Sequence, residues 1–409
     1  MTQQGGETVR IRAWLRWVAG ISLGLMLALL GANLALLPGV AAFTAPSTEI
    51  RGVWLTNIDS EVLFQPEQLT AALKRLKRLQ FNTVYPTVWN GGYTLYPSPV
   101  AEQAIGRAID PDPRFQGRDP LAEVVETSHT QGLSVIPWFE FGLMAPAESE
   151  LAQRHPDWIA QRRDRTTVFM EGSHPRVWLN PLHPQVQQFM VDAIADIARR
   201  YPVDGIQLDD HFGLPVEFGY DPLTLKLYQA EHGGRLPPDN ATDPAWMRWR
   251  ADKLTALMKR IFYAVKAENP DCLISLSPNP RKFSYDKYLQ DWWTWERQGF
   301  IEELIVQIYR NDLFSFVAEL NRPEMDLAKQ HIPVGIGILT GLKHRSVPMG
   351  QIAKQVEVSR QQGFAGVSFF FYETLDTSET ETPLEREKRF SQLFPHSATR
   401  PTLSTQDSQ

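Results

Sequence analysis

The chain has 409 residues, of which 43% are hydrophobic and 22% are charged, and its formal net charge is −6 at pH 7. This composition is ordinary for a globular protein with a full hydrophobic core. No basic cluster alternates with aromatic residues, so we expect no nucleic-acid partner. The single cysteine, Cys272, excludes an intramolecular disulfide. The Cys and His spacings of metal sites are missing, so we predict neither a metal nor another cofactor.

The first 42 residues carry a targeting pattern. Arg10, Arg12 and Arg16 precede an uncharged stretch at residues 17–37, and small residues follow up to Ala42. We predict a signal peptide or a signal anchor at residues 1–42, because the stretch is also long enough to span a bilayer. Either form exports the remaining chain to the periplasm or cell envelope, and an uncleaved segment 17–37 would be its membrane contact. The polar residues 395–409 are predicted to be a disordered tail.

Between these ends, strand-like and helix-like patterns alternate eight times. The strands are expected at Gly52–Asn57, Asn82–Asn90, Leu133–Phe141, Val203–Asp210, Cys272–Asn279, Leu304–Tyr309, Ile332–Leu339 and Gly366–Glu373. The helices are expected at Pro66–Leu79, Pro120–Gln131, Pro184–Arg200, Ala245–Glu268, Asp286–Gln298, Asp312–Gln330, Met349–Gln362 and Glu385–Leu393.

This alternation predicts an α/β fold: a single (β/α)8 TIM barrel over residues 48–394. A doubly wound sheet is disfavoured because no Gly-rich dinucleotide or phosphate loop is present. Long loops are expected after strands 3 and 4, at residues 142–181 and 211–243. Because they follow strand ends, they would wall a cleft on the catalytic face. We assign no chemistry to residues 170–175 within the first of these loops.

The fourth strand ends in two carboxylates and an imidazole, at Asp209, Asp210 and His211. Barrel enzymes place their chemistry at such strand ends. Period-two alternation puts Gln207 and Asp209 on one face, which suits the barrel lumen. Asp210 then points to the helix layer unless the strand ends before it, in which case it can turn into the cleft as an acid/base or bind a sugar hydroxyl; its structural alternative is a helix cap.

Polar and aromatic side chains gather at the carboxyl ends of the predicted strands, as expected for an enzyme. Glycoside hydrolysis needs one carboxylate at the anomeric carbon and a second, protonated carboxyl that donates to the leaving oxygen. The catalytic candidates are Asp209, Asp210, Glu140 and Glu373. The substrate-binding candidates are Asn57, Tyr85, Trp89, Asn90, Trp138, Asn180, Gln207, His211, Asn279 and Tyr309.

Several of these candidates have a structural alternative. Glu140 could form a salt bridge in the barrel mouth, and Glu373 could make a hydrogen bond at a strand end. Trp138 suits the core better than a sugar platform, whereas Trp89 and Tyr309 suit a platform. Asn180 could cap the helix that follows it, and we expect His211 to make hydrogen bonds rather than to act as a catalyst.

Four segments resemble one family. They are Arg51-Gly52-Val53-Trp54-Leu55-Thr56-Asn57, the Asn82–Trp89 run, Trp178-Leu179-Asn180-Pro181, and Val203–Asp210. Together they are similar to the glycosyl-hydrolase-like family 10 of bacterial envelope proteins, over roughly residues 48–394. The resemblance implies a barrel glycosidase, and some members of that family act on peptidoglycan glycan strands.

Two other barrel families resemble the fourth strand in part. The alpha-amylase pattern places its nucleophile at Asp209, but it has Arg where this chain has Gln207, and its fifth-strand acid is absent. The chitinase pattern matches Asp204, Gly205 and Asp209, but its acid falls at His211. Both comparisons agree on Asp209 and leave the general acid open.

We therefore predict an exported glycoside hydrolase that cleaves an N-acetylhexosamine-containing glycan, with peptidoglycan as the leading substrate. One alternative is a glycan-binding barrel without turnover, and another is an amylase-like alpha-glucan hydrolase. A polysaccharide deacetylase is disfavoured because the Asp and His metal constellation is missing.

Overall fold

The computed structural model describes residues 45–402, so the predicted targeting segment lies outside the described residues. The core is a parallel sheet of nine strand segments in the order β5-β2-β1-β16-β13-β12-β11-β10-β6. Their bounds are β1 Ile50–Leu55, β2 Thr83–Pro86, β5 Ser134–Val135, β6 Trp138–Phe139, β10 Gly205–Asp209, β11 Leu273–Ser277, β12 Glu303–Gln307, β13 Val334–Leu339 and β16 Gly366–Phe370.

The two end segments of this sheet, β5 and β6, are pieces of the one predicted third strand. β5 pairs with β2 and β6 pairs with β10, so the nine segments occupy eight positions and the sheet closes. The interruption falls at Pro137, which has no N–H to donate to a neighbouring strand. Its carbonyl still accepts from the Gln207 N–H at 2.8 Å. The predicted (β/α)8 barrel is thus confirmed.

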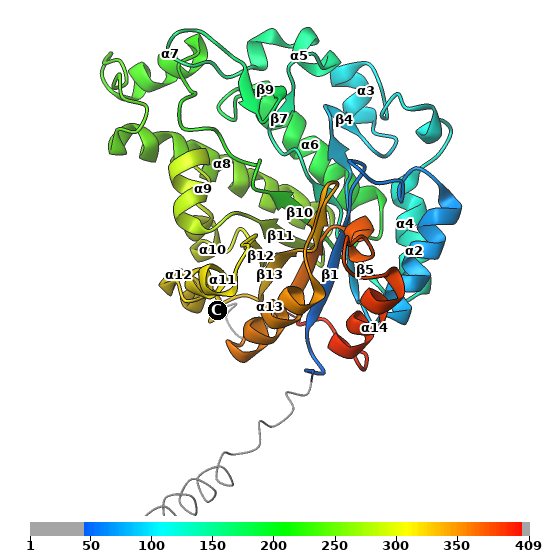
Figure 1. Cartoon of the computed structure of the whole chain (residues 1–409). Helices are drawn as coiled ribbons and strands as arrows, with labels where there is room; N and C mark the ends of the chain where they lie inside the picture. Colours follow the sequence, from blue (N-terminus) through cyan, green and yellow to red (C-terminus); the bar gives the residue numbers. More distant parts are fainter. Residues whose placement is uncertain (1–44, 403–409) are drawn as a thin grey trace, which may run out of the picture. The chain divides into compact units, whose positions relative to one another are not determined.

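Helices surround the strands (Figure 1). Those that follow barrel strands are α2 Pro66–Arg78, α4 Pro120–Thr130, α6 Pro184–Arg200, α8 Pro244–Glu268, α9 Arg281–Tyr288, α10 Trp292–Arg297, α11 Leu313–Leu320, α12 Pro323–Ala328, α13 Met349–Gln361 and α14 Pro383–Leu393. Two predicted helices are each split in two. Leu289, with φ of 52°, separates α9 from α10, and Pro323 begins α12 after α11 has ended.

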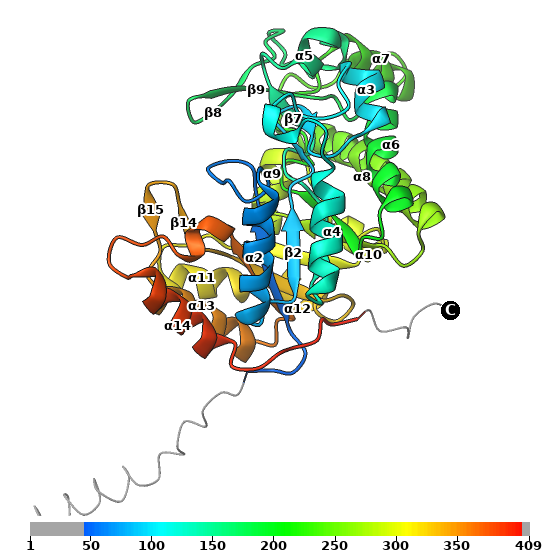
Figure 2. The same cartoon turned by 90° about the vertical axis from the view of Figure 1, so that its right-hand side faces the viewer.

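The insertions gather at one end of the barrel (Figure 2). They contain α3 Pro99–Ile105, α5 Glu150–Arg154, α7 Pro222–Glu231 and a small sheet of β7 Met144–Pro146, β8 Phe169–Glu171 and β9 His174–Trp178. The predicted long loops after strands 3 and 4 are therefore present, and they carry secondary structure of their own. Among the helices of residues 45–402, none has both the length and the apolar composition needed to cross a bilayer.

The base of the barrel differs from two expectations. Tyr85 lies along the interior above Gly52, where a Cβ would come within 2.6 Å of the Tyr85 ring. Its hydroxyl donates to Glu303 at 3.3 Å, at the beginning of β12, so Tyr85 is not a substrate-binding residue. Arg400 pairs with the same Glu303 carboxylate, and Thr399 bridges to Thr48.

Residues 395–402 therefore pack along the base, although they were predicted to belong to a disordered tail. The physical reason is the buried Glu303 carboxylate, which needs a cation, and Arg400 supplies it. Residues 403–409 of the predicted tail lie outside the part of the chain that the structure describes.

We expect Arg400→Ala to destabilise the barrel by about 3 kcal/mol, because it leaves the Glu303 carboxylate buried without its cation. Urea unfolding of the full chain, followed by tryptophan fluorescence, measures this loss. Arg389→Ala, at an exposed arginine of α14, is the matched control and should change stability by less than about 0.5 kcal/mol. Equal stability of the two variants would contradict the role assigned to Arg400.

Candidate active site

Asp209 is the last residue of β10 and is only 3% exposed. The side-chain amide of Gln307, at the end of β12, donates to Asp209 Oδ1 at 2.7 Å. Burial and the neighbouring Asp210 charge raise the pKa of Asp209 well above its ordinary value. Asp209 thus lies at the mouth of the lumen, on the face that the alternation predicted.

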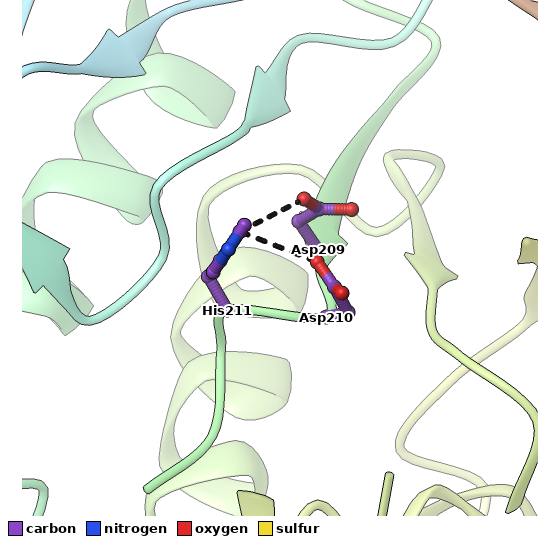
Figure 3. Close-up of side chains that lie close together, drawn as sticks. All are labelled: Asp209, Asp210 and His211. Carbon is purple, nitrogen blue, oxygen red and sulfur yellow. Dashed lines mark ion pairs between the residues drawn. The ribbon is translucent and has the colours of Figure 1, made fainter. Parts of the chain in front are cut away.

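Asp210 follows the end of the strand, so its side chain is free to turn beside Asp209 (Figure 3). Asn279 Nδ2 donates to Asp210 Oδ2 at 2.5 Å. His211 Nδ1 lies 3.2 Å from Asp210 Oδ1 and 3.4 Å from Asp209 Oδ2. The imidazole therefore joins the two carboxylates.

His211 is surrounded by oxygen acceptors on both ring nitrogens. Nδ1 also lies 3.1 Å from the main-chain oxygen of Glu140, and Nε2 lies 3.2 Å from Glu171 Oε1. Burial alone would lower the pKa of His211, but the surrounding carboxylates outweigh it and raise that pKa well above its usual value. The hydrogen bond from His211 lowers the pKa of Glu171 to about 2. Both ring nitrogens of His211 therefore face oxygen acceptors, and this environment favours the imidazolium form.

Glu140 comes directly after β6, and the register pairs Phe139 with Leu208. It therefore occupies the position next to Asp209 on the neighbouring strand. Its carboxyl is buried and accepts hydrogen bonds from Asn90 Nδ2 at 2.6 Å, Thr87 Oγ1 at 3.0 Å and Thr56 Oγ1 at 3.1 Å. Burial outweighs these bonds and raises the pKa of Glu140 to about 7. A salt bridge in the barrel mouth was the alternative role expected of Glu140 from the sequence, but within residues 45–402 Glu140 forms no salt bridge.

A glycine lets the loops after β6 and β10 approach closely enough to form this cluster. Gly142 has φ of +50°, and a Cβ there would lie 2.5 Å from the Phe212 nitrogen. The Leu143 N–H also donates to the His211 carbonyl at 3.1 Å. These backbone contacts hold Glu140 and His211 side by side.

Two more predicted residues border the cluster. Tyr309 is half-buried and stacks on Phe370 with ring centroids 5.8 Å apart. Burial and the nearby charges of Asp209, Asp210 and Glu140 raise the pKa of its phenol. Asn57 accepts from Asn90 Nδ2 at 3.0 Å, so it lies behind the group that holds Glu140.

Other predicted site residues have structural roles. Gln207 is fully buried below Asp209, where it accepts from the Trp54 indole and donates to Ser275. Trp138 lies in the same interior layer and packs against Trp54. It is therefore a core residue, as the sequence favoured.

Two further predictions do not fit a sugar-binding role. Trp89 is buried, donates to the Gly142 carbonyl and packs against Phe189, so it is not a sugar platform. Asn180 accepts from the Leu182 N–H and donates to Thr224, so it orders a turn.

Glu373 lies apart from the Asp209 cluster. It lines a separate cavity of about 730 Å³ and accepts a hydrogen bond from the Ser60 hydroxyl. A hydrogen bond at a strand end was the structural role expected of Glu373 from the sequence, and the bond to Ser60 is of this kind. Burial raises the pKa of Glu373, but nothing places it next to Asp209.

The sequence alone missed several residues of the site. Thr56 and Thr87 follow barrel strands, so the strand-end rule could have found them, as it found Gln307 at the end of the sixth strand. Glu171 had no such signal, because it lies on the β8–β9 hairpin and no chemistry was assigned to that loop. Only the folding of this hairpin over the barrel brings it to His211.

The ligand atoms of Asp209, Asp210 and His211 lie within 4.8 Å of one another, which is close enough for a metal ion. A histidine ligand must offer a lone pair from a neutral ring. In this structure Nδ1 and Nε2 of His211 lie within hydrogen-bond distance of the Glu140 main-chain oxygen and of Glu171 Oε1.

The solved structures that this chain resembles are barrel glycoside hydrolases. The glycoside hydrolase domain of PgaB from Bordetella bronchiseptica matches with a TM-score of 0.60 and 15% identity, over 82% of this chain and 100% of that one. A beta-galactosidase from Rahnella sp. R3 matches with a TM-score of 0.61 and 15% identity, over 85% of this chain and 56% of that one. The fold is thus that of a barrel glycoside hydrolase.

The sequence itself identifies the family. The model of the family described as glycosyl hydrolase-like 10 matches residues 49–359, and the chain belongs to this family. Glycosyl hydrolase DigH of Escherichia coli (strain K12) is 26% identical over 313 residues, which cover 64% of this chain and 66% of that protein. Glycosyl hydrolase YngK of Bacillus subtilis (strain 168) is 25% identical over 298 residues, covering 64% and 54%. The chain thus matches less than two thirds of either relative.

We expect Glu171→Gln to lower the pKa of His211 by about one unit, because it removes one of the carboxylates that stabilise the imidazolium. NMR titration of the His211 ring in the full chain measures the change. Glu148→Gln, at an exposed acid in the same insertion, is the control and should leave that pKa in place. An unshifted pKa in Glu171→Gln would mean that Glu171 does not determine the charge of His211.

Proposed function

We propose that this chain is an exported glycoside hydrolase that cleaves an N-acetylhexosamine-containing glycan, with peptidoglycan strands as the leading substrate. One observation carries the proposal. A buried carboxyl with a pKa of about 7, Glu140, lies on the strand next to a second buried carboxyl, Asp209. Two carboxyl groups in different environments are what acid-assisted glycoside cleavage requires.

Glu140 is the general acid in this mechanism. With a pKa of about 7, a large share of Glu140 is protonated at neutral pH and can donate its proton to the departing glycosidic oxygen. Its three hydrogen-bond donors, Thr56, Thr87 and Asn90, fix the carboxyl and stabilise the carboxylate that remains after proton transfer. The proton therefore leaves a group that is already prepared for the charge.

Asp209 acts on the other side of the reaction, in its ionised form, as the nucleophile or as the charge that stabilises the oxocarbenium-like transition state. Burial and Asp210 raise its pKa, whereas the hydrogen bond and charge of His211 favour the carboxylate. Gln307 fixes one of its oxygens, and the His211 imidazolium faces the other. Asp210, held by Asn279, shares the imidazolium and adds negative charge beside the anomeric carbon. This arrangement favours a cationic transition state over a neutral substrate.

Export and the glycan class have separate support. The pattern at residues 1–42 predicts a signal peptide or anchor, which would bring the barrel to the periplasm or cell envelope. The sequence resembles a family of bacterial envelope proteins that includes members active on peptidoglycan. Export and substrate class do not depend on the Asp209 cluster, so the reaction and the substrate can be tested independently.

We expect the purified full chain to release new reducing ends from peptidoglycan sacculi or from amidase-stripped glycan strands, as detected by mass spectrometry. Asp209→Asn and Glu140→Gln should each lower kcat/KM at least about 100-fold. Glu102→Gln, at an exposed acid of α3, is the control and should remain active. Binding of strands by the wild type without any cleavage would instead favour a glycan-binding barrel.

An aryl glycoside separates the two catalytic roles. Its leaving group needs no proton, so Glu140→Gln should recover most of its activity on this substrate, whereas Asp209→Asn should not. Equal losses on both substrates would remove the acid role from Glu140.

The pH profile tests the environment of Glu140. Wild-type kcat/KM should fall above about pH 7, as the acid loses its proton. The Thr87 hydrogen bond favours the carboxylate and lowers the pKa of Glu140, so Thr87→Val should raise that pKa and move the alkaline limb to higher pH. If the alkaline limb of the kcat/KM profile is at the same pH in Thr87→Val and wild type, a group other than Glu140 determines it.

A further inference from the structure

A cavity distinct from the one at Glu373 borders Glu140. It has a volume of about 470 Å³ and is lined by Thr56, Ile58, Asp59, Glu140, Leu342, Lys343, His344, Arg345, Phe370 and Phe371. The carboxyl of Glu140 is thus within reach of whatever the cavity holds. Apolar side chains supply much of the wall, as suits the faces of a sugar ring.

The polar part of this wall is basic. β14 Gly341–Leu342 and β15 Arg345–Ser346 form a hairpin whose turn carries Lys343 and His344. Lys343 Nζ is neutralised by Asp59 Oδ1 at 2.8 Å. Arg345 reaches only the amide oxygen of Asn311, at 3.4 Å, and within residues 45–402 no carboxylate pairs with it.

We propose that this cavity is a subsite for a sugar unit that carries a carboxylate, and that Arg345 is the residue that binds the carboxylate. The inference rests on the proposed glycosidase function and names its substrate class more closely. A guanidinium presents two parallel N–H groups to a carboxylate, which makes it a specific as well as a charged partner.

The floor of the cavity is compatible with such a ligand. Because the pKa of Glu140 is about 7, the group is increasingly protonated below that pH, and its repulsion of a second carboxylate falls accordingly. The faces of Phe370 and Leu342 can cover the apolar side of the ring while its substituent reaches the hairpin. The same cavity therefore provides a proton donor, a ring platform and a cation.

In peptidoglycan the carboxylate has two sources. Removal of the stem peptide exposes the carboxylate of the lactyl ether, whereas strands that keep the peptide present its carboxylates instead. The recognition chemistry is the same, so substrates of both kinds are needed to identify the source.

The test compares wild type with Arg345→Gln on three substrates. They are amidase-stripped strands, the same strands with their carboxyl groups reduced to alcohols, and strands that keep stem peptides. We expect Arg345→Gln to lower kcat/KM about tenfold on a carboxylated substrate and to have no effect on the reduced strands. The loss should shrink at high salt, because Arg345 is exposed.

Arg389→Gln on α14 is the control for loss of an exposed arginine and should match wild type on every substrate. If Arg345→Gln loses kcat/KM only on stripped strands, Arg345 binds the lactyl carboxylate. If it loses kcat/KM only on peptide-bearing strands, Arg345 binds a carboxylate of the peptide. Equal losses on carboxylated and reduced strands, or no loss on either, would overturn the subsite.

The experiment distinguishes failure of the glycosidase proposal from failure of the subsite proposal. If wild type cleaves none of the substrates, calorimetric Kd values replace kcat/KM in the same comparison. Arg345→Gln should then weaken binding of carboxylated strands about tenfold and leave reduced strands unaffected. That result would retain the subsite while the glycosidase proposal fails, and equal Kd values would overturn the subsite as well.

Discussion

The site depends on one half-buried side chain, His211, whose carboxylate neighbours favour the imidazolium form. Asp209 and Asp210 lie at the end of a buried strand, where unpaired carboxylates would be strongly destabilising. His211 lies against both, and its other nitrogen faces Glu171. A single side chain thereby connects the end of β10, the loop after β6 and the β8–β9 hairpin. The position of each carboxylate follows from this shared partner, together with the close backbone approach at Gly142.

Burial raises the pKa of both Glu140 and Asp209, but the groups that contact their carboxyls differ. The Glu140 carboxyl is held by hydroxyl and amide donors rather than by an adjoining cation, and burial raises its pKa to about 7. Asp209, by contrast, faces the imidazolium and lies beside a second carboxylate. Two carboxyl groups of similar intrinsic acidity therefore have different tasks because their surroundings differ. The family membership of the chain is consistent with this division.

Much of the fold could be predicted, because each strand and helix carries a local pattern. Residues 286–298 and 312–330 were wrongly predicted as single helices, although Pro323 marked one of the two breaks. Asp209 and Gln207 lie in the lumen, as the period-two alternation of β10 predicted. Tyr85 and Trp89 were misplaced because a strand pattern does not show at which depth of the barrel a side chain lies. The role of Arg400 depends on Glu303, 97 positions earlier in the chain, and no local pattern signals such a pair.

The sequence by itself determined the barrel, the strand that carries Asp209, and the families that it resembles. These depend on periodicity and on short motifs, which are properties of neighbouring residues. The tertiary structure decided which carboxyl adjoins Asp209, the charge of His211, and the place of Glu171 and Arg345. Those features depend on contacts between residues far apart in the chain, and on the burial that the complete barrel creates. A titratable group acquires its proton affinity only after such neighbours are in place.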